Sequence, residues 1–398
     1  MLVVDNRTGE ILAYATNRHS SASYVDGVVA PRQAGSTLKP FVYGLAIEKR
    51  LLTAGSLIED APLEIATGGG LYAPGNYDDS YAGLVTVREA LASSLNTPAV
   101  RALMLLDGDE FLERLKLLGF TGIERDAAYY GYAMALGSLD VSLYELVGAY
   151  RALANLGRYT PLSAIKKTGP PAVQALSPQA SFIITDILSD RAARSRTFGL
   201  ENALATPYFA AVKTGTSKDM RDNWCLGFSQ RYTVGVWVGN FSGEPMWNVS
   251  GVSGAAPVWV ETMDYLVRGS LPPKPPAELV RRKTCRQGGR CRNEWYLKGT
   301  EPNGPSQLAR QHAHTRISYP PRGTTLALDP DIPAAHQQVV FSASPAQANL
   351  SWQLDGHRLG PADASGRLAW QLKAGQHRLK LIDRRGQVLD TVEFRVKL

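Results

Sequence analysis

The sequence contains few of the residues that build disulfide scaffolds or metal sites. Among its 398 residues are only three cysteines, at positions 225, 285 and 291, and six histidines. That number of cysteines excludes a cysteine-rich scaffold. We expect no metal and no other cofactor. No run of 18 apolar residues occurs, so we expect no segment that crosses a bilayer. The chain opens directly on the strand-like stretch 2–5, so we expect no signal peptide there.

Charge and apolar content set only broad limits on the kind of protein. The formal net charge is +7. This mild excess suits a polyanionic surrounding such as a cell wall or a membrane surface without requiring one, and we expect no nucleic-acid partner. Apolar residues make up 44% of the chain, enough for real cores. The length favours two or three domains.

The stretch 35–41 has the pattern of a nucleophile held at the start of a helix. Gly35 precedes an apolar-periodic run that predicts an amphipathic helix. Ser36 then lies in the first turn, where free backbone N–H groups and the helix dipole favour developing negative charge. Lys39 is three residues on and shares a helix face with Ser36. A lysine whose pKa is lowered by burial can take the proton of a serine hydroxyl.

Two further short motifs occur along the chain. Ser94 and Asn96 follow a predicted helix over 85–92, and Lys213 opens a Lys-Thr-Gly-Thr sequence at the end of a predicted strand. Taken singly, each motif has an ordinary interpretation, because such serines and asparagines often cap helices and such lysines are often solvated. Together, S-x-x-K, S-x-N and K-T-G form the trio typical of penicillin-binding proteins and class A β-lactamases.

The order of the predicted elements favours an α+β (α/β) domain. A hairpin is predicted over 2–16, and helical periodicity dominates from 36 to 157, with a Gly- and Pro-rich loop over 57–81. Another helix is predicted over 177–189, and three short strands of a meander over 209–238. We expect one antiparallel sheet packed against a helical block.

Residues 2 to about 265 resemble the transpeptidase domain of a bifunctional class A penicillin-binding protein. The stretches that carry the resemblance are 4–13, 35–41, 72–77, 90–100, 135–138, 149–157, 213–217 and 222–224. The resemblance implies the penicillin-binding and serine β-lactamase-like fold. It implies a periplasmic peptidoglycan D,D-transpeptidase that acts on D-Ala-D-Ala stem peptides and is inhibited covalently by β-lactam antibiotics.

The resemblance also implies how an acyl-enzyme forms. Ser36 attacks the penultimate carbonyl of the stem peptide, with Lys39 as its base. Asn96 orients Lys39 and bonds the substrate amide. Ser94 relays a proton to the leaving amine, and Lys213 holds the polarity of Ser94. Which lysine or serine moves each proton stays open.

The strand motif is expected to bind the substrate. Lys213, Thr214 and Thr216 offer a cation and two hydroxyls to the terminal carboxylate, and an extended peptide can lie along Gly215 because it has no side chain. The backbone N–H groups of Ser36 and Thr216 are expected to form the oxyanion hole.

Three alternative functions share parts of this pattern. A class A β-lactamase would need a deacylating glutamate within a Glu-x-x-Leu-Asn string, which the sequence lacks. A D,D-carboxypeptidase shares all three motifs and differs only in its acceptor, water instead of an amine. A non-catalytic penicillin-binding sensor or scaffold needs only acylation and no turnover.

The composition changes after residue 265. The stretch 271–276 predicts a polyproline-like linker, and 281–292 holds six basic residues and no acidic one. A basic stretch of this kind is usually a solvated loop, and the sharper alternative is contact with an anionic polymer or lipid head groups. Cys285 and Cys291 bracket two glycines with no metal-type spacing nearby, which favours a disulfide over a zinc site. Cys225 is expected to be a buried free thiol.

The last part of the chain predicts a separate all-β domain. Strict alternation and hairpin-type turns over 314–398 suggest an immunoglobulin-like sandwich. The linker and this tail resemble the C-terminal extension of type 1C penicillin-binding proteins, which implies a docking role toward cell-wall protein partners. The expected domains are thus 1–268, the linker with a disulfide loop over 269–313, and 314–398.

The resemblance implies two parts that this sequence does not contain. Members of the family carry a membrane anchor and a glycosyltransferase domain upstream of the transpeptidase domain. We therefore expect this chain to be either an expression fragment or a truncated gene product, and we expect no glycan polymerisation from it.

Overall fold

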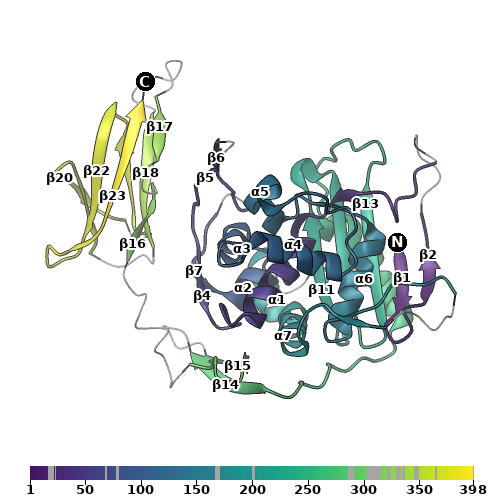
Figure 1. The fold of residues 1–398 in the computed structure, drawn as a ribbon. Helices are drawn as coiled ribbons and strands as arrows, with labels where there is room; N and C mark the ends of the chain where they lie inside the picture. Colours follow the sequence, from purple (N-terminus) through teal and green to yellow (C-terminus); the bar gives the residue numbers. More distant parts are fainter. Residues whose placement is uncertain are drawn as a thin grey trace. The chain divides into compact units, whose positions relative to one another are not determined.

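The computed structural model describes most of the chain and groups it into two compact units. The described residues are 1–16, 22, 24–67, 70–77, 80–165, 171–199, 202–285, 291–302, 315–320, 324–328, 333, 337–344, 349–363 and 365–397 (Figure 1). The first unit comprises Met1–Ser56, Thr86–Thr284 and Cys291–Glu301, and the second comprises Leu57–Val85, Cys285–Arg290 and Pro302–Leu398. All three motifs lie in the first unit.

A five-stranded antiparallel sheet forms the centre of the first unit. Its strands, in spatial order, are β11 (Ala211–Thr216), β12 (Asp222–Phe228), β13 (Tyr232–Gly239), β1 (Leu2–Asp5) and β2 (Ile11–Tyr14). The predicted hairpin over 2–16 and the predicted meander are confirmed. Strand β11 lies at one edge of the sheet, which leaves one side of its backbone unpaired within this sheet.

Helices cover both faces of this sheet. A Cβ on Gly235 would meet Leu143 and Val147 of α6 (Leu143–Ala154), whereas a Cβ on Gly227 would meet Trp259 of α9 (Ala256–Leu266). Leu226 pairs with Gly235, and neighbours along a strand point to opposite faces. The sheet therefore lies between α6 and α9, and the predicted α+β architecture is confirmed.

The remaining helices of the first unit form the helical block around the motifs. They are α1 (Lys39–Glu48), α2 (Val87–Ala92), α3 (Asn96–Leu103), α4 (Gly108–Leu117), α5 (Ala127–Tyr130), α7 (Pro178–Ser189) and α8 (Arg191–Phe198). Short helices are η1 (Gly35–Leu38), η2 (Gly131–Leu136), η3 (Lys218–Met220) and η4 (Gly251–Ala255). The predicted helices over 85–92 and 177–189 are confirmed. Thr86 and Glu89 form a capping box at the start of α2, and Ser177 caps α7.

Several short strands were not predicted. Part of the expected loop over 57–81 forms β4 (Leu57–Asp60), β5 (Ile65–Thr67) and β6 (Gly70–Tyr72), and β7 (Gly83–Thr86) pairs with β4. Two-residue strands also occur, namely β3 (Arg32–Gln33), β8 (Asp140–Val141), β9 (Arg158–Tyr159) and β10 (Val173–Gln174). Strands this short carry too few residues for a periodic signal.

A hairpin follows the proline-rich stretch. Its strands are β14 (Leu279–Cys285) and β15 (Cys291–Leu297). The Trp295 ring packs edge-on against Phe182 of α7 with centroids 5.4 Å apart, and Tyr296 is 1% exposed. The strand that closes the hairpin therefore packs against the body of the first unit.

The cysteines divide into one pair and one single thiol. Cys285 and Cys291 are disulfide-bonded, and Cys225 is free and buried.

Titration of the denatured, non-reduced protein should count one free thiol per chain, and Cys285→Ser should raise the count to two. Three thiols from protein made in an oxidising compartment would contradict the pairing. Closing so short a loop removes only about 2 kcal/mol of chain entropy, so Cys285→Ser should shift the thermal midpoint little.

The described C-terminal residues form two β-sheets around an aromatic core. One sheet contains β16 (Arg316–Tyr319), β18 (Gln338–Ser344) and β21 (Arg367–Gln371). The other contains β17 (Thr325–Ala327), β23 (Val388–Lys397), β22 (Gly375–Ile382), β19 (Ser351–Leu354) and β20 (His357–Pro361). Phe341 from the first sheet packs near Trp352 and Phe394 from the second. The predicted all-β C-terminal domain is confirmed.

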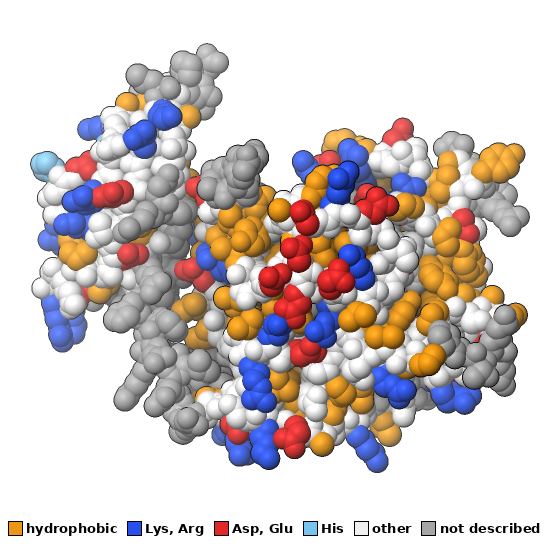
Figure 2. All heavy atoms as spheres, in the orientation of Figure 1, with side chains coloured by type: hydrophobic (Ala, Val, Ile, Leu, Met, Phe, Trp, Pro, Cys, Tyr) orange, Lys and Arg blue, Asp and Glu red, His pale blue; other side chains and the backbone are white. Residues whose placement is uncertain are grey.

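Surface charge and helix length add little to this picture. Acidic and basic side chains are interspersed over the face of the first unit that Figure 2 shows. Within the part of the chain that the structure describes, no helix is long and apolar enough to cross a bilayer.

Candidate active site

The first motif lies where a 3₁₀ turn runs into an α-helix. Helix η1 begins at Gly35, as predicted, and α1 continues it from Lys39. The Ser36 carbonyl accepts the backbone N–H of Lys39. Ser36 is half-buried, whereas the Lys39 side chain is fully buried. The turn thus presents a serine near solvent and places a lysine beneath it.

The Lys39 amine reaches the second motif. Its Nζ donates to the Ser94 carbonyl and to Asn96 Oδ1, both at 2.6 Å, and lies 3.5 Å from Ser94 Oγ. The first motif therefore meets the second through the Lys39 amine.

The Lys213 amine reaches the same serine from β11. Its Nζ donates to Ser94 Oγ at 2.7 Å and to the Thr214 carbonyl at 2.8 Å. Burial, and then the nearby Arg194 cation, lower the pKa of Lys213 from 10.5 to about 7, while Cys225 acts in the opposite direction. A group with this pKa gains and loses protons readily near neutral pH.

Ser94 has an unusual backbone conformation. Its φ is +59°, in the left-handed region that a non-glycine residue adopts at a cost. Its N–H donates to the Leu91 carbonyl at 3.1 Å, which fixes the residue to the end of α2. The Thr197 hydroxyl donates to the Ser93 carbonyl at 2.8 Å from α8. The hydroxyl between the two lysines is thus held in place by its main chain.

The first and third motifs touch through their main chains. A Cβ on Gly35, whose φ is +53°, would lie 2.8 Å from the Thr216 carbonyl oxygen. A Cβ on Gly215 would lie 2.7 Å from the Thr37 side chain. Both glycines are therefore needed for this close approach. The contact brings the backbones of Ser36 and Thr216, the expected oxyanion-hole donors, into neighbouring segments.

The threonines of the third motif lie on the other face of β11. Thr216 Oγ1 accepts the backbone N–H of Gly251 at 3.1 Å, and a Cβ on Gly251 would lie 3.1 Å from Thr214 Cβ. Because side chains alternate along a strand, the Lys213 side chain points to the opposite face, and a side chain at position 215 would do the same. The structure therefore gathers Lys39, Ser94, Asn96 and Lys213, and places the two threonine hydroxyls beside η4.

Two features of the site were missed from the sequence. Arg194 of α8 is 4% exposed and lines a small cavity together with Lys213. Gly137, at φ +80°, accepts the Gly35 N–H through its carbonyl at 3.0 Å and supports η1. An arginine in a helix without flanking apolar periodicity carries no sequence signal for burial.

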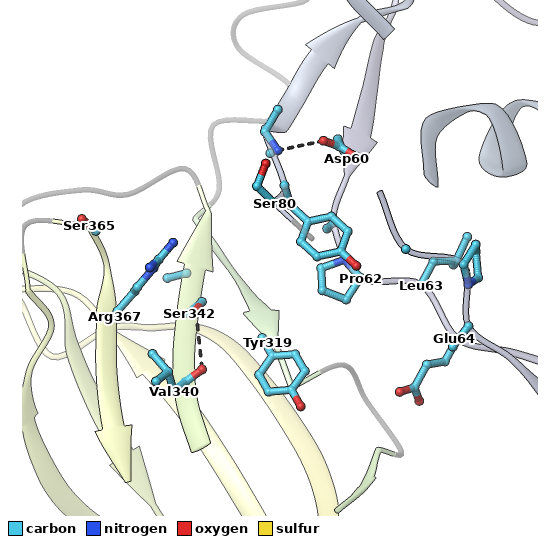
Figure 3. Close-up of a pocket in the computed structure, with 18 residues that line it drawn as sticks. Asp60, Pro62, Leu63, Glu64, Ser80, Tyr319, Val340, Ser342, Ser365 and Arg367 are labelled. Atoms are coloured by element: carbon cyan, nitrogen blue, oxygen red, sulfur yellow. Dashed lines mark hydrogen bonds between the residues drawn. The ribbon is translucent and has the colours of Figure 1, made fainter. Parts of the chain in front are cut away.

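A larger hollow in the second unit carries none of this chemistry. It has a volume of about 650 Å³ (Figure 3). Its Asp60 carboxylate accepts the Asn76 amide and the Ala82 N–H, each at 2.8 Å. The Asp60 carboxylate therefore already holds bonds within its own segment, and the three motifs lie in the other unit.

A serine at a helix start, with a second serine between two buried lysines, defines a serine acyltransferase site. The sequence model of the penicillin binding protein transpeptidase domain matches residues 1–243, more than half of the chain. The chain therefore belongs to the penicillin-binding transpeptidase family. The Penicillin-Binding Protein C-terminus Family matches residues 304–394.

Curated relatives agree with this assignment. Penicillin-binding protein 1C of Escherichia coli strain K12 is 31% identical over 85% of this chain and 46% of its own length. Penicillin-binding protein 1B of Vibrio cholerae is 31% identical over 68% of this chain and 36% of its own length. The chain thus spans less than half the length of these relatives.

Solved structures share the fold. Penicillin-binding protein 1A from Haemophilus influenzae superposes with a TM-score of 0.68 at 22% identity, covering 77% of this chain and 54% of that one. The PonA1 protein from Mycobacterium tuberculosis, in complex with penicillin V, gives a TM-score of 0.57 at 22% identity, covering 69% of this chain and 79% of that one.

Proposed function

We propose that the chain is a peptidoglycan D,D-transpeptidase that forms an acyl-enzyme at Ser36 on D-Ala-D-Ala stem peptides. The observation that carries the proposal is the convergence of Lys39 Nζ and Lys213 Nζ on Ser94 Oγ. Two buried amines around one hydroxyl provide a route for protons into and out of the site.

Acylation uses the first two motifs. Ser36 Oγ bonds to the penultimate carbonyl carbon while its proton passes to the neutral amine of Lys39. Ser94 gives its proton to the leaving amine, the C–N bond breaks, and D-Ala departs. Lys213, bonded to Ser94 Oγ, returns a proton to it. An acceptor amine then bonds to the acyl carbonyl carbon and passes a proton through Ser94 to Lys213. The Ser36 Oγ–C bond breaks, and Lys39 returns its proton to Ser36.

The third motif binds the substrate in this proposal. The stem peptide lies along the open edge of β11 and pairs with its main chain. The backbone N–H groups of Ser36 and Thr216 stabilise the oxyanion, a contribution of about 3–4 kcal/mol per donor. Thr216 Oγ1 accepts from Gly251 and keeps its own proton to donate to the terminal carboxylate, and Thr214 adds a second hydroxyl.

A paired assay separates this function from its alternatives. The protein is labelled with a fluorescent penicillin and then given a D-Ala-D-Ala donor with or without an acceptor amine. A transpeptidase forms the cross-linked product, a D,D-carboxypeptidase releases D-Ala without it, and a sensor or scaffold only takes up the label. Absence of labelling would contradict the proposal.

The setting of the reaction follows from the proposed substrate. Stem peptides are the proposed partners and β-lactams the proposed inhibitors, which places the reaction in the periplasm. The C-terminal domain is proposed to dock cell-wall proteins. The domain limits 1–268, 269–313 and 314–398 stay a prediction.

The glycine contact gives a prediction with a matched control. Gly35→Ala should slow β-lactam acylation about a hundredfold, because the new methyl group would push η1 away from the Thr216 backbone. Gly131 also has a positive φ, +61°, but a Cβ there would meet nothing within 4 Å. Gly131→Ala should therefore introduce backbone strain without a steric clash, and it should leave the acylation rate near that of wild type. Equal slowing in both variants would contradict the contact's role.

A further inference from the structure

An ionic cluster with a buried centre joins the hairpin β14–β15 to helix α2. We define the cluster as Arg88, Asp186, Asp190, Arg292 and Glu294. Arg88 Nε donates to both Glu294 carboxylate oxygens at 2.7 and 2.9 Å, and Arg88 Nη2 donates to Glu294 Oε2 at 2.6 Å. The Arg88 side chain is 2% exposed and that of Glu294 is 5% exposed. Strand β15 thus supplies a buried, bidentate partner for the arginine of α2.

Asp190 is shared by both arginines of the cluster. Arg88 Nη1 donates to Asp190 Oδ2 at 3.2 Å, and Arg292 from β15 pairs with the same oxygen. The Asp190 side chain is 6% exposed. Buried charges of this kind depend on one another, because removing one leaves its partner uncompensated. Neutralising Glu294 therefore alters the forces on Arg88 and, through it, on Asp190.

One path leads from the cluster to Ser94. Arg88 lies on α2, whose last residue is Ala92. The N–H groups of Ser94 and Leu95 donate back to carbonyls of the same helix at 3.1 and 2.9 Å. A shift of α2 is therefore carried directly to Ser94, which already sits in a strained conformation.

A second path leads through α8 to Lys213. Asp190 Oδ1 accepts the Ala193 N–H at 3.0 Å and so caps α8. The Ala193 carbonyl in turn accepts the Ser93 hydroxyl at 3.0 Å. Arg194, the next residue of α8, lines a small cavity together with Lys213. Helix α8 therefore connects the ionic cluster to both residues of the Ser94–Lys213 hydrogen bond.

We propose that Glu294 is a positioning residue for acylation, acting through Arg88 and Asp190 on the Ser94–Lys213 hydrogen bond. The proposal rests on the proposed function of the Ser36 site. Strand β15 lies outside the segment 1–243 that the transpeptidase family model matches. It contributes no side chain to the Ser36 site, and in this proposal it affects the chemistry of that site through the ionic cluster.

The test compares Glu294→Gln with Tyr296→Phe in the full chain. Tyr296 lies on the same strand and is equally buried, and its hydroxyl bonds to Thr284 rather than to the ionic cluster. With a fluorescent penicillin, Glu294→Gln should lower the first-order acylation constant about tenfold and leave the dissociation constant of the initial complex within twofold. Tyr296→Phe should acylate at the wild-type rate. Rates are measured well below the lowest thermal midpoint, and Glu294→Asp replaces Gln if that variant does not fold.

Hydrogen exchange supplies a readout that does not depend on acylation. Peptides covering 89–97 should exchange faster in Glu294→Gln than in wild type and should be unchanged in Tyr296→Phe. An unchanged acylation constant and unchanged exchange in Glu294→Gln would overturn the proposal, as would equal effects in the two variants. If the wild type is not acylated at all, the proposed function fails, and the exchange comparison still decides whether Glu294 positions Ser94.

Discussion

Ser36→Ala is expected to abolish the covalent adduct with a β-lactam. In wild type the intact mass should rise by one ligand, because Ser36 is the half-buried hydroxyl at the start of η1–α1. Alanine keeps the helix start and removes only the hydroxyl of the proposed nucleophile, so the fold and the thermal midpoint should change little. Intact-mass spectrometry after incubation with penicillin measures the outcome.

A second serine provides the control for this variant. Ser195 lies on α8, where its hydroxyl bonds to the Ala192 carbonyl of its own helix. Ser195→Ala should form the adduct as wild type does. Retention of the adduct in Ser36→Ala, or its loss in Ser195→Ala, would show that another residue is acylated.

Lys213→Met is expected to slow acylation by a carboxylate-bearing β-lactam about ten- to a hundredfold. A hydrogen bond to a charged group contributes about 1.5–3 kcal/mol, and Lys213 donates to Ser94 Oγ, the proposed proton relay. Lys218→Met, at an exposed position of η3 just past β11, should react at the wild-type rate. Rates from stopped-flow labelling compare the two variants.

The same substitution should change how stability depends on pH. The pKa of Lys213 is about 7 in the folded chain and 10.5 in its ordinary state, mainly because burial disfavours the ammonium form. Between these values the unfolded chain binds more protons, so the free energy of unfolding of wild type rises with pH. Below pH 7 the full cost of burying the charge is present. Lys213→Met should therefore be the more stable protein at pH 6, and its advantage should shrink toward pH 10.

Urea unfolding at several pH values measures this difference. A constant gap between wild type and Lys213→Met from pH 6 to pH 10 would show that Lys213 does not titrate in this range. A loss of stability in Lys213→Met that matches its loss of acylation would show a structural role instead.

The sequence was sufficient to predict those elements whose structure is decided by local chemistry. The start of η1 at Gly35 and the strand that ends in the Lys213 motif follow from glycine placement and from period-two alternation. The two helices predicted over 85–92 and 177–189 have their own caps, and such caps can be read from the sequence.

Long-range packing explains what the sequence did not reveal. The Gly35–Thr216 approach joins segments that lie far apart in the chain, and only the fold shows that no side chain fits there. The burial of Arg88 against Glu294 likewise depends on a partner that lies 206 residues away in the sequence. The basic stretch 281–292 reads as a solvated loop, yet Arg292 pairs with a buried carboxylate of another element.

The buried Cys225 gives the protein its own reporter of core opening. Its strand β12 lies between β11 and β13, its side chain belongs to a buried cluster that includes Trp259 and Met263 of α9, and burial raises the pKa of its thiol far above the ordinary value. An alkylating reagent can reach it only when this packing opens, so the rate of native-state labelling measures the population of that open state. With Cys285 and Cys291 paired, every label reports on this one position. Ligand binding along the edge of β11 should then appear as slower alkylation.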